Sequence, residues 1–281
     1  MAEPVRTPDY PHPRWRLGLL SILLALSVIA SVGGWMDQPA RELNDTALKR
    51  ALVTFAVART LNGVISMAQG TEVAVQPAGV GVNLAPGELL DPVNDLVESF
   101  SAVMLYASVA LGTQKLLLGI SDGVWWSVLL GLLSFWYIGL ALRGAPMARP
   151  VGRWLLAFWL ARFAVPLITV GTEAAFHWFL EPEYERSSTE LGVATERMAT
   201  LQAQEAEALP PPDEGFLDRA GRWWDSTKSS FDISARLEAL KEAATTAISN
   251  MITLIVVFLL QTVAIPSALL WFGWAQVRRR V

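Results

Sequence analysis

Three acid–base side chains follow one another at four-residue intervals in the second half of the chain. Glu173, His177 and Glu181 have the spacing that places side chains along one face of a helix. A histidine between two carboxylates can relay a proton or provide a weak metal site. The neighbouring Trp178 favours a second interpretation, a polar face at a membrane surface. We expect this structural role and keep acid–base chemistry as the alternative.

Cations inside apolar segments form the second group of candidates. Arg162 lies four residues before Pro166 in an otherwise apolar stretch, and Arg59 and Lys115 interrupt two weaker apolar stretches. A charge at the centre of a bilayer costs about 2.5–3.5 kcal/mol, so it either lines a polar path or finds a partner. We expect structural pairing or snorkelling for Arg162. Arg59 and Lys115 line a pore only if their helices span the membrane, and are otherwise interfacial cations.

The last apolar segment contains two further residues of interest. Gln261 places an amide among apolar residues, and Pro266 frees a backbone carbonyl and can kink a helix. A kink of this kind suits a gate. Proline is also frequent in membrane helices, so a structural role is the expectation for both residues.

Most familiar catalytic chemistries are excluded by residue content. The chain has no cysteine, which rules out disulfides, thiolate metal sites and a cysteine nucleophile. Its only histidines are His12 and His177, too few for a multi-histidine metal centre. No phosphate-binding loop, zinc-protease motif or serine-hydrolase motif occurs. We therefore expect no cofactor and no metal, and the net charge of −4 gives no indication of nucleic-acid binding.

Stretches long enough to cross a bilayer must position these residues. The chain is 53% hydrophobic and 17% charged, whereas a soluble domain is about 25% charged. Membrane-spanning helices are predicted for 17–36, 124–142, 154–172 and 250–276. The first run is longer than the apolar core of a signal peptide, so we expect an uncleaved anchor. The predicted fold is an all-α integral membrane protein.

Orientation follows from arginines beside the predicted spans. Arginine clusters occur in the tail 1–16, the loop 143–153 and the tail 277–281. Such clusters stay on the cytoplasmic side. This places both termini in the cytoplasm and is typical of a multi-pass protein of a bacterial inner membrane, with 37–123 as a periplasmic or interfacial region.

Two weaker stretches, 51–68 and 96–120, leave the number of spans open. If one crosses the membrane both must, because otherwise the loop 143–153 moves to the wrong side. Their charges, Arg59 and Lys115, favour four spans, and six spans are the alternative.

The polar region 173–249 is predicted to be a periplasmic helical hairpin. It holds 15 acidic and 7 basic residues, a net charge of −8, and a triple proline at 210–212 divides it into two arms. The second arm is expected to run on into the last span, and the first to continue from the third. Alternating valines around a Pro-Ala-Gly turn in 71–84 predict a small β-hairpin.

Three functions fit these features. The leading hypothesis is a non-catalytic oligomeric scaffold or channel-forming component, whose partners are the lipid bilayer and either further copies of itself or another membrane protein. A secondary transporter that uses Arg59, Lys115 and Arg162 in one cavity is the first alternative. A membrane enzyme that uses His177 on lipid or envelope substrates is the second.

Overall fold

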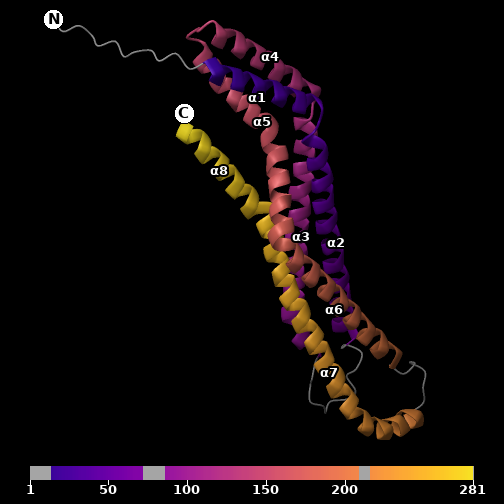
Figure 1. Ribbon diagram of the computed structural model, residues 1–281. Helices are drawn as coiled ribbons and strands as arrows, with labels where there is room; N and C mark the ends of the chain where they lie inside the picture. Colours follow the sequence, from indigo (N-terminus) through magenta and orange to yellow (C-terminus); the bar gives the residue numbers. More distant parts are fainter. Residues whose placement is uncertain (1–13, 72–85, 209–215, 281) are drawn as a thin grey trace, which may run out of the picture. The chain divides into compact units, whose positions relative to one another are not determined.

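The computed structural model describes residues 14–71, 86–208 and 216–280, which are helical almost throughout (Figure 1). No strand occurs within these ranges. The predicted β-hairpin is therefore not supported: Thr71 ends a helix, and the remaining hairpin residues lie outside the described part of the chain. The chain divides into two compact units. Unit 1 comprises residues 1–45 and 113–171, and unit 2 comprises 46–112 and 172–281.

Unit 1 contains helices α1 (Arg14–Val32) and α4 (Val124–Leu142). It also contains the beginning of α2 (Asp37–Thr71), the end of α3 (Pro86–Ser121) and most of α5 (Ala148–Ala175). Helix α4 has the predicted bounds of the span 124–142. Helix α1 ends four residues before the predicted position 36, and α5 begins six residues before the predicted position 154.

Two glycines in the left-handed conformation end α1 and α4. Gly34 has φ 64°, and Trp35 donates its backbone N–H to the carbonyl of Ala30 at 3.3 Å. Gly144 has φ 63° and closes α4 in the same way. This is the Schellman arrangement, in which glycine avoids the Cβ clash of a left-handed residue. Gly34 therefore separates α1 from α2, and the two helices are bent by 53°.

Small side chains bring α1 and α4 together. The hydroxyls of Ser31 and Ser127 lie 2.7 Å apart, and a Cβ at Gly131 would stand 3.7 Å from Val28. Small residues at such a contact let helix backbones approach closely, which suits packing in lipid. A compact apolar cluster around Leu130, Leu155 and Phe163 completes this core.

Unit 2 is built around a helical hairpin. Its arms are α6 (Glu181–Ala208) and α7 (Phe216–Leu259), and α8 (Ile265–Arg280) follows α7. Glu190 contacts Asn250, and Arg197 contacts Glu242, so the partners run in opposite directions along the two arms. The predicted antiparallel hairpin is confirmed. Both arms also continue into their neighbouring apolar helices through single π-helical turns, η2 (Phe176–Leu180) and η3 (Leu260–Ala264).

The core of unit 2 follows a heptad pattern. Buried residues recur at alternating intervals of three and four on each contributing helix, the spacing of coiled-coil packing. They are Ala47, Ala51, Thr54, Ala58, Leu61 and Ile65 on α2; Val93, Val97, Phe100, Met104, Ala107 and Leu111 on α3; Ser187, Leu191, Ala194 and Met198 on α6; and Ala244, Ala247, Met251, Leu254 and Phe258 on α7. The alanines of α2 and α7 shorten the distance at which these helices can pack.

Within the described residues, four helices are long and apolar enough to cross a membrane, as in a multi-pass membrane protein. They are Val93–Ser121, Val124–Leu142, Pro150–Leu201 and Glu238–Gln276, and the bent pair formed by α1 and α2 would make a fifth. The number agrees with the predicted four, but the set differs. It includes Val93–Ser121, which overlaps the ambiguous stretch 96–120, and it counts α1 only together with α2.

Candidate functional site

Arg162, in unit 1, is fully buried and fixes the break between α1 and α2. Its Nη1 and Nη2 donate to the two carboxylate oxygens of Asp37 at 2.9 and 2.5 Å. Its Nε donates to the hydroxyl of Ser31 at 3.1 Å, and Nη2 also reaches the Ser31 carbonyl at 3.5 Å. Arg162 is 0% exposed and Asp37 is 2% exposed, so the pair is shielded from bulk solvent. The predicted structural pairing of Arg162 thus has a defined geometry.

The position of this pair suits the electrostatics of both helix ends. Ser31 lies in the last turn of α1, where carbonyls without helical partners carry partial negative charge. Asp37 is the first residue of α2, where a carboxylate faces the positive end of the helix dipole. The guanidinium therefore binds the end of one helix and the start of the next. Both helices are held at the angle that Gly34 permits.

Four charges of alternating sign on helix α2 each meet an opposite charge from another segment of the chain. They are Asp37, Arg41, Asp45 and Arg50, and the same stretch also carries Glu42 and Lys49. Asp37 pairs with Arg162 on α5, and Arg41 pairs with Asp122 after α3. Asp45 pairs with Lys115 on α3, and Arg50 pairs with Glu173 on α5. Alternating charges specify helix register, since a shift by one turn would oppose like charges. The first three pairs belong to unit 1 and the fourth to unit 2.

Glu173 is the centre of a buried polar cluster in unit 2. One of its carboxylate oxygens accepts a hydrogen bond from Arg50, and the other accepts one from Nε2 of Gln261 at 3.1 Å. The Arg50 guanidinium also lies 3.8 Å from the ring centroid of Phe176. Glu173 is 3% exposed and Gln261 is 1% exposed. The charge of Glu173 is thus stabilised by a cation and an amide.

This cluster lies between the two π-helical turns, and a proline explains each turn. Turn η2 ends at Leu180 and is followed after one residue by Pro182; turn η3 ends at Ala264 and is followed after one residue by Pro266. Proline has no N–H to donate, and its ring clashes with the carbonyl four residues earlier. A wider turn relieves that clash. Turns of this kind occur frequently at functional sites.

Three polar atoms near the cluster have no hydrogen-bond partner within the described residues. They are Nε of Arg50, Oε1 of Gln261 and the hydroxyl of Thr172. A buried polar atom without a partner costs about 1–3 kcal/mol, which points to an unseen water, ligand or alternative conformation. The cluster is therefore the part of unit 2 best suited to a polar ligand or to proton uptake.

The structure divides the predicted acid–base triad. His177 Nδ1 lies 2.9 Å from Oε2 of Glu181, and both side chains are substantially exposed. Glu173 instead points inward to Arg50. The wider turn η2 begins between Glu173 and His177, so their spacing of four no longer keeps them on one face.

The two remaining cationic candidates lie on the surface. Lys115 is half exposed and pairs with Asp45 at 2.8 Å in unit 1. Arg59 is exposed on α2 in unit 2. Arg162, in contrast, is fully buried and paired with Asp37.

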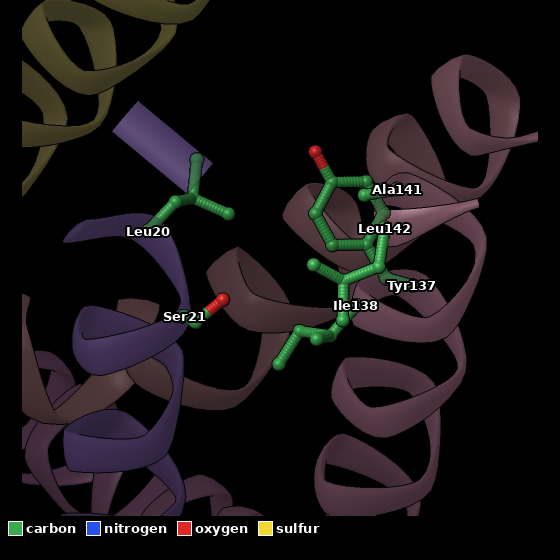
Figure 2. A pocket seen from close by; sticks show the side chains of 6 residues that line it. All are labelled: Leu20, Ser21, Tyr137, Ile138, Ala141 and Leu142. Atoms are coloured by element: carbon green, nitrogen blue, oxygen red, sulfur yellow. The ribbon is translucent and has the colours of Figure 1, made fainter. Parts of the chain in front are cut away.

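Two small hollows occur among the described residues. One in unit 1 has a volume of about 10 Å³ and lies between Leu20 and Ser21 on α1 and Tyr137 and Ile138 on α4 (Figure 2). Another in unit 2, beside Glu190 and between α6 and α7, has about 190 Å³. Pockets for small-molecule ligands usually have about 300–1,000 Å³. Among the residues that the structure describes, no three or more potential metal ligands lie together.

Three charged members of these pairs, Asp37 and Arg50 on α2 and Asp122 after α3, were not singled out by the sequence. Asp37 and Arg50 lie in polar stretches, where nothing distinguishes them from solvated charges, and Asp122 lies in a short connection between two apolar stretches. The available signal was the alternation of sign at four-residue intervals from Asp37 to Asp45, which matches one helix face. No protein-family model, curated protein or solved structure matches this chain.

Proposed function

We propose that this chain is a non-catalytic membrane scaffold that assembles with further copies of itself. The observation that carries the proposal is the use of its polar side chains. Arg162, Glu173 and Lys115, which could have served transport or catalysis, each bind another helix of the same chain. Large apolar side chains of the same helices face outward, including Leu105 and Val109 on α3. Helices whose polar side chains pair within the chain and whose exposed surface is apolar are suited to binding neighbouring chains.

The proposal includes a topology with four spans. Helix α1, helix α4, the first half of α5 and the apolar end of α7 with α8 cross the membrane. The apolar stretches 51–68 and 96–120 then belong to a helical bundle with α6 and α7. Their buried faces follow the heptad pattern that α6 shares. Helix α6 exposes charged side chains such as Arg186 and Glu183, which favour water over lipid.

The bundle is proposed to lie in the periplasm of a bacterial cell, with both termini in the cytoplasm. The arginine clusters of the tails and of the loop 143–153 support this orientation. The acidic character of 173–249 agrees with it.

Co-purification of two tagged copies tests the scaffold proposal. The full chain is expressed with two different affinity tags in the same cells, extracted in mild detergent and transferred to nanodiscs. When the two tagged chains are expressed at equal levels, we expect purification through either tag to recover the chain that carries the other tag. Light scattering should give a multiple of the 30.7 kDa chain mass. Mixing of separately extracted copies controls for association after lysis. A chain that is monomeric in both detergent and nanodiscs contradicts the proposal.

A second candidate function is an ion-coupled carrier. The partnerless Nε of Arg50 and Oε1 of Gln261 beside the carboxylate of Glu173 favour it, because carriers use buried carboxylates as proton or cation sites. The test is proton flux into liposomes that contain the purified chain. Flux that is lost in Glu173→Gln but retained in Glu181→Gln supports the carrier. Equal flux with and without the protein argues against it.

A further inference from the structure

The outer faces of α2 and α3 in unit 2 carry large apolar side chains. On α2, Leu52 and Val53 are 49% and 52% exposed. On α3, Leu105, Tyr106 and Val109 are 47%, 71% and 58% exposed. In water these side chains would leave apolar surface uncovered on both helices.

Charged residues occupy the same faces. Arg59 follows Leu52 by seven residues, and Glu98 precedes Leu105 by seven residues. Seven residues are nearly two full helical turns, so each charge shares a face with the leucine of its own helix. Arg59, Asp95 and Glu98 are exposed and have no ion-pair partner within the described ranges.

Neither water nor lipid is a favourable covering for this surface. Water would solvate Arg59 and Glu98 but leave the apolar residues unburied. Lipid would bury the apolar residues but surround three unpaired charges with hydrocarbon. A protein surface that is apolar and carries charges of both signs satisfies both requirements. The α2–α3 face is itself apolar and carries charges of both signs, so a second copy of the same face is a suitable partner.

We propose that the α2–α3 face binds the same face of a second copy, with Arg59 of one copy paired to Glu98 of the partner subunit. This inference rests on the proposed self-assembly and specifies its interface. Copies inserted in one membrane in the same direction are related by an axis along the membrane normal. A two-fold axis of that kind, lying along the bundle, places α2 of each copy opposite α3 of the other at the same height.

The register of α2 and α3 brings the two charges to matching heights. Asp45 on α2 pairs with Lys115 on α3 at 2.8 Å, and Arg41 pairs with Asp122 further along, so the helices are antiparallel. Continuing along each helix by the same number of residues places Arg59 level with Ser101. Glu98 lies within one helical turn of that height, which an arginine side chain can reach. The same register places Leu105 opposite the region around Ala56 of the partner subunit.

Charge reversal tests this interface in the full chain reconstituted in phosphatidylethanolamine–phosphatidylglycerol vesicles. Association is followed by energy transfer between two labelled populations as the chain is diluted with lipid. Arg59→Glu and Glu98→Arg are each expected to raise the dissociation constant by at least about tenfold, because like charges then face each other. The double variant should return it to within about threefold of the original. Arg186→Glu on α6, 63% exposed, is the matched control and should leave it unchanged.

A disulfide test does not depend on how charge variants fold. One tagged copy carries Ala56→Cys and the other carries Leu105→Cys, and the native chain has no cysteine. Mild oxidation should link the two copies. The pair of Ala56→Cys with Val193→Cys, a 59% exposed position on α6, should remain unlinked.

The outcomes separate this interface from self-assembly itself. An oligomer that tolerates both single reversals, or that links through Val193→Cys as readily as through Leu105→Cys, overturns the α2–α3 interface and leaves the scaffold proposal standing. A chain that shows no energy transfer at any protein density overturns both.

Discussion

Removing one partner of the Arg162–Asp37 pair should strongly destabilise the protein. Arg162 is 0% exposed, and its two shortest hydrogen bonds both go to Asp37, at 2.9 and 2.5 Å. Asp37→Leu leaves a guanidinium without its counterion in a site that water does not reach. Loss of one partner from a buried ion pair costs about 3–5 kcal/mol, much of it the penalty of the remaining charge. Arg162→Met should cost a similar amount for the same reason.

The double variant distinguishes a charge effect from lost packing. When both charges are replaced by apolar groups of similar volume, the buried charge disappears, and such replacements are often neutral or stabilising. We expect Asp37→Leu with Arg162→Met to be at least about 3 kcal/mol more stable than the sum of the single effects predicts. The exposed pair of Asp45 and Lys115, with side chains 52% and 54% exposed, is the control and should contribute about 0–1 kcal/mol.

Equilibrium unfolding in mixed micelles provides the measurement. The chain contains 12 tryptophans, and Trp126 and Trp159 pack in the core of unit 1, so their fluorescence reports its unfolding. Single variants that lose less than about 1 kcal/mol, as an exposed pair would, refute the view that this pair holds the α1–α2 break.

Three further predictions concern residues whose environments differ sharply. Glu173→Gln leaves Arg50 without a carboxylate partner and should cost about 3 kcal/mol of unfolding free energy in the same assay, whereas Glu181→Gln at the surface should cost under about 1 kcal/mol. Gly34→Ala forces a side chain into φ 64° and should cost about 1–2 kcal/mol, while Gly63→Ala, with nothing within 4 Å of an added Cβ inside α2, should stabilise by up to about 1 kcal/mol. Pro266→Ala restores a backbone donor and should convert η3 to regular α-helix, which spin-label distances across that turn would detect as a rotation of α8 relative to α7.

Parts of the fold were predictable because local signals agreed with the tertiary structure. Helix α4 has its predicted bounds, since an uninterrupted apolar run stops at Arg143 and Gly144 supplies the left-handed residue that ends it. The antiparallel hairpin of α6 and α7 was predictable from two polar amphipathic segments separated by a proline cluster. Unbroken helical periodicity indicated that each arm continues into an apolar helix.

Other features depended on contacts that one sequence does not reveal. A structural pair was expected for Arg162, but Asp37 is distant in the chain and resembles any helix-starting acid. Glu173 and His177 were placed on one face by counting four residues, which assumes a regular α-helix. The wider turn η2 separates them, and only Pro182, two residues beyond that turn, hinted at it. The outward position of Arg59 likewise depends on which face of α2 the bundle buries.

The central claim is that the apolar stretches of α2 and α3 form a bundle outside the membrane rather than two additional spans. Single cysteines at Thr60 and Ser99, both exposed, and at Met147, 61% exposed, are treated with an impermeant maleimide in intact cells. Alkylation needs a thiolate in contact with water. In an Arg59→Glu background, which opens the proposed α2–α3 interface beside these two positions, we expect labelling at Thr60 and Ser99, and labelling at Met147 only after the membrane is opened. If cysteines at Thr60 and Ser99 stay unlabelled even in opened membranes while the cysteine at Met147 reacts, both helices lie in lipid. That result would contradict the bundle outside the membrane.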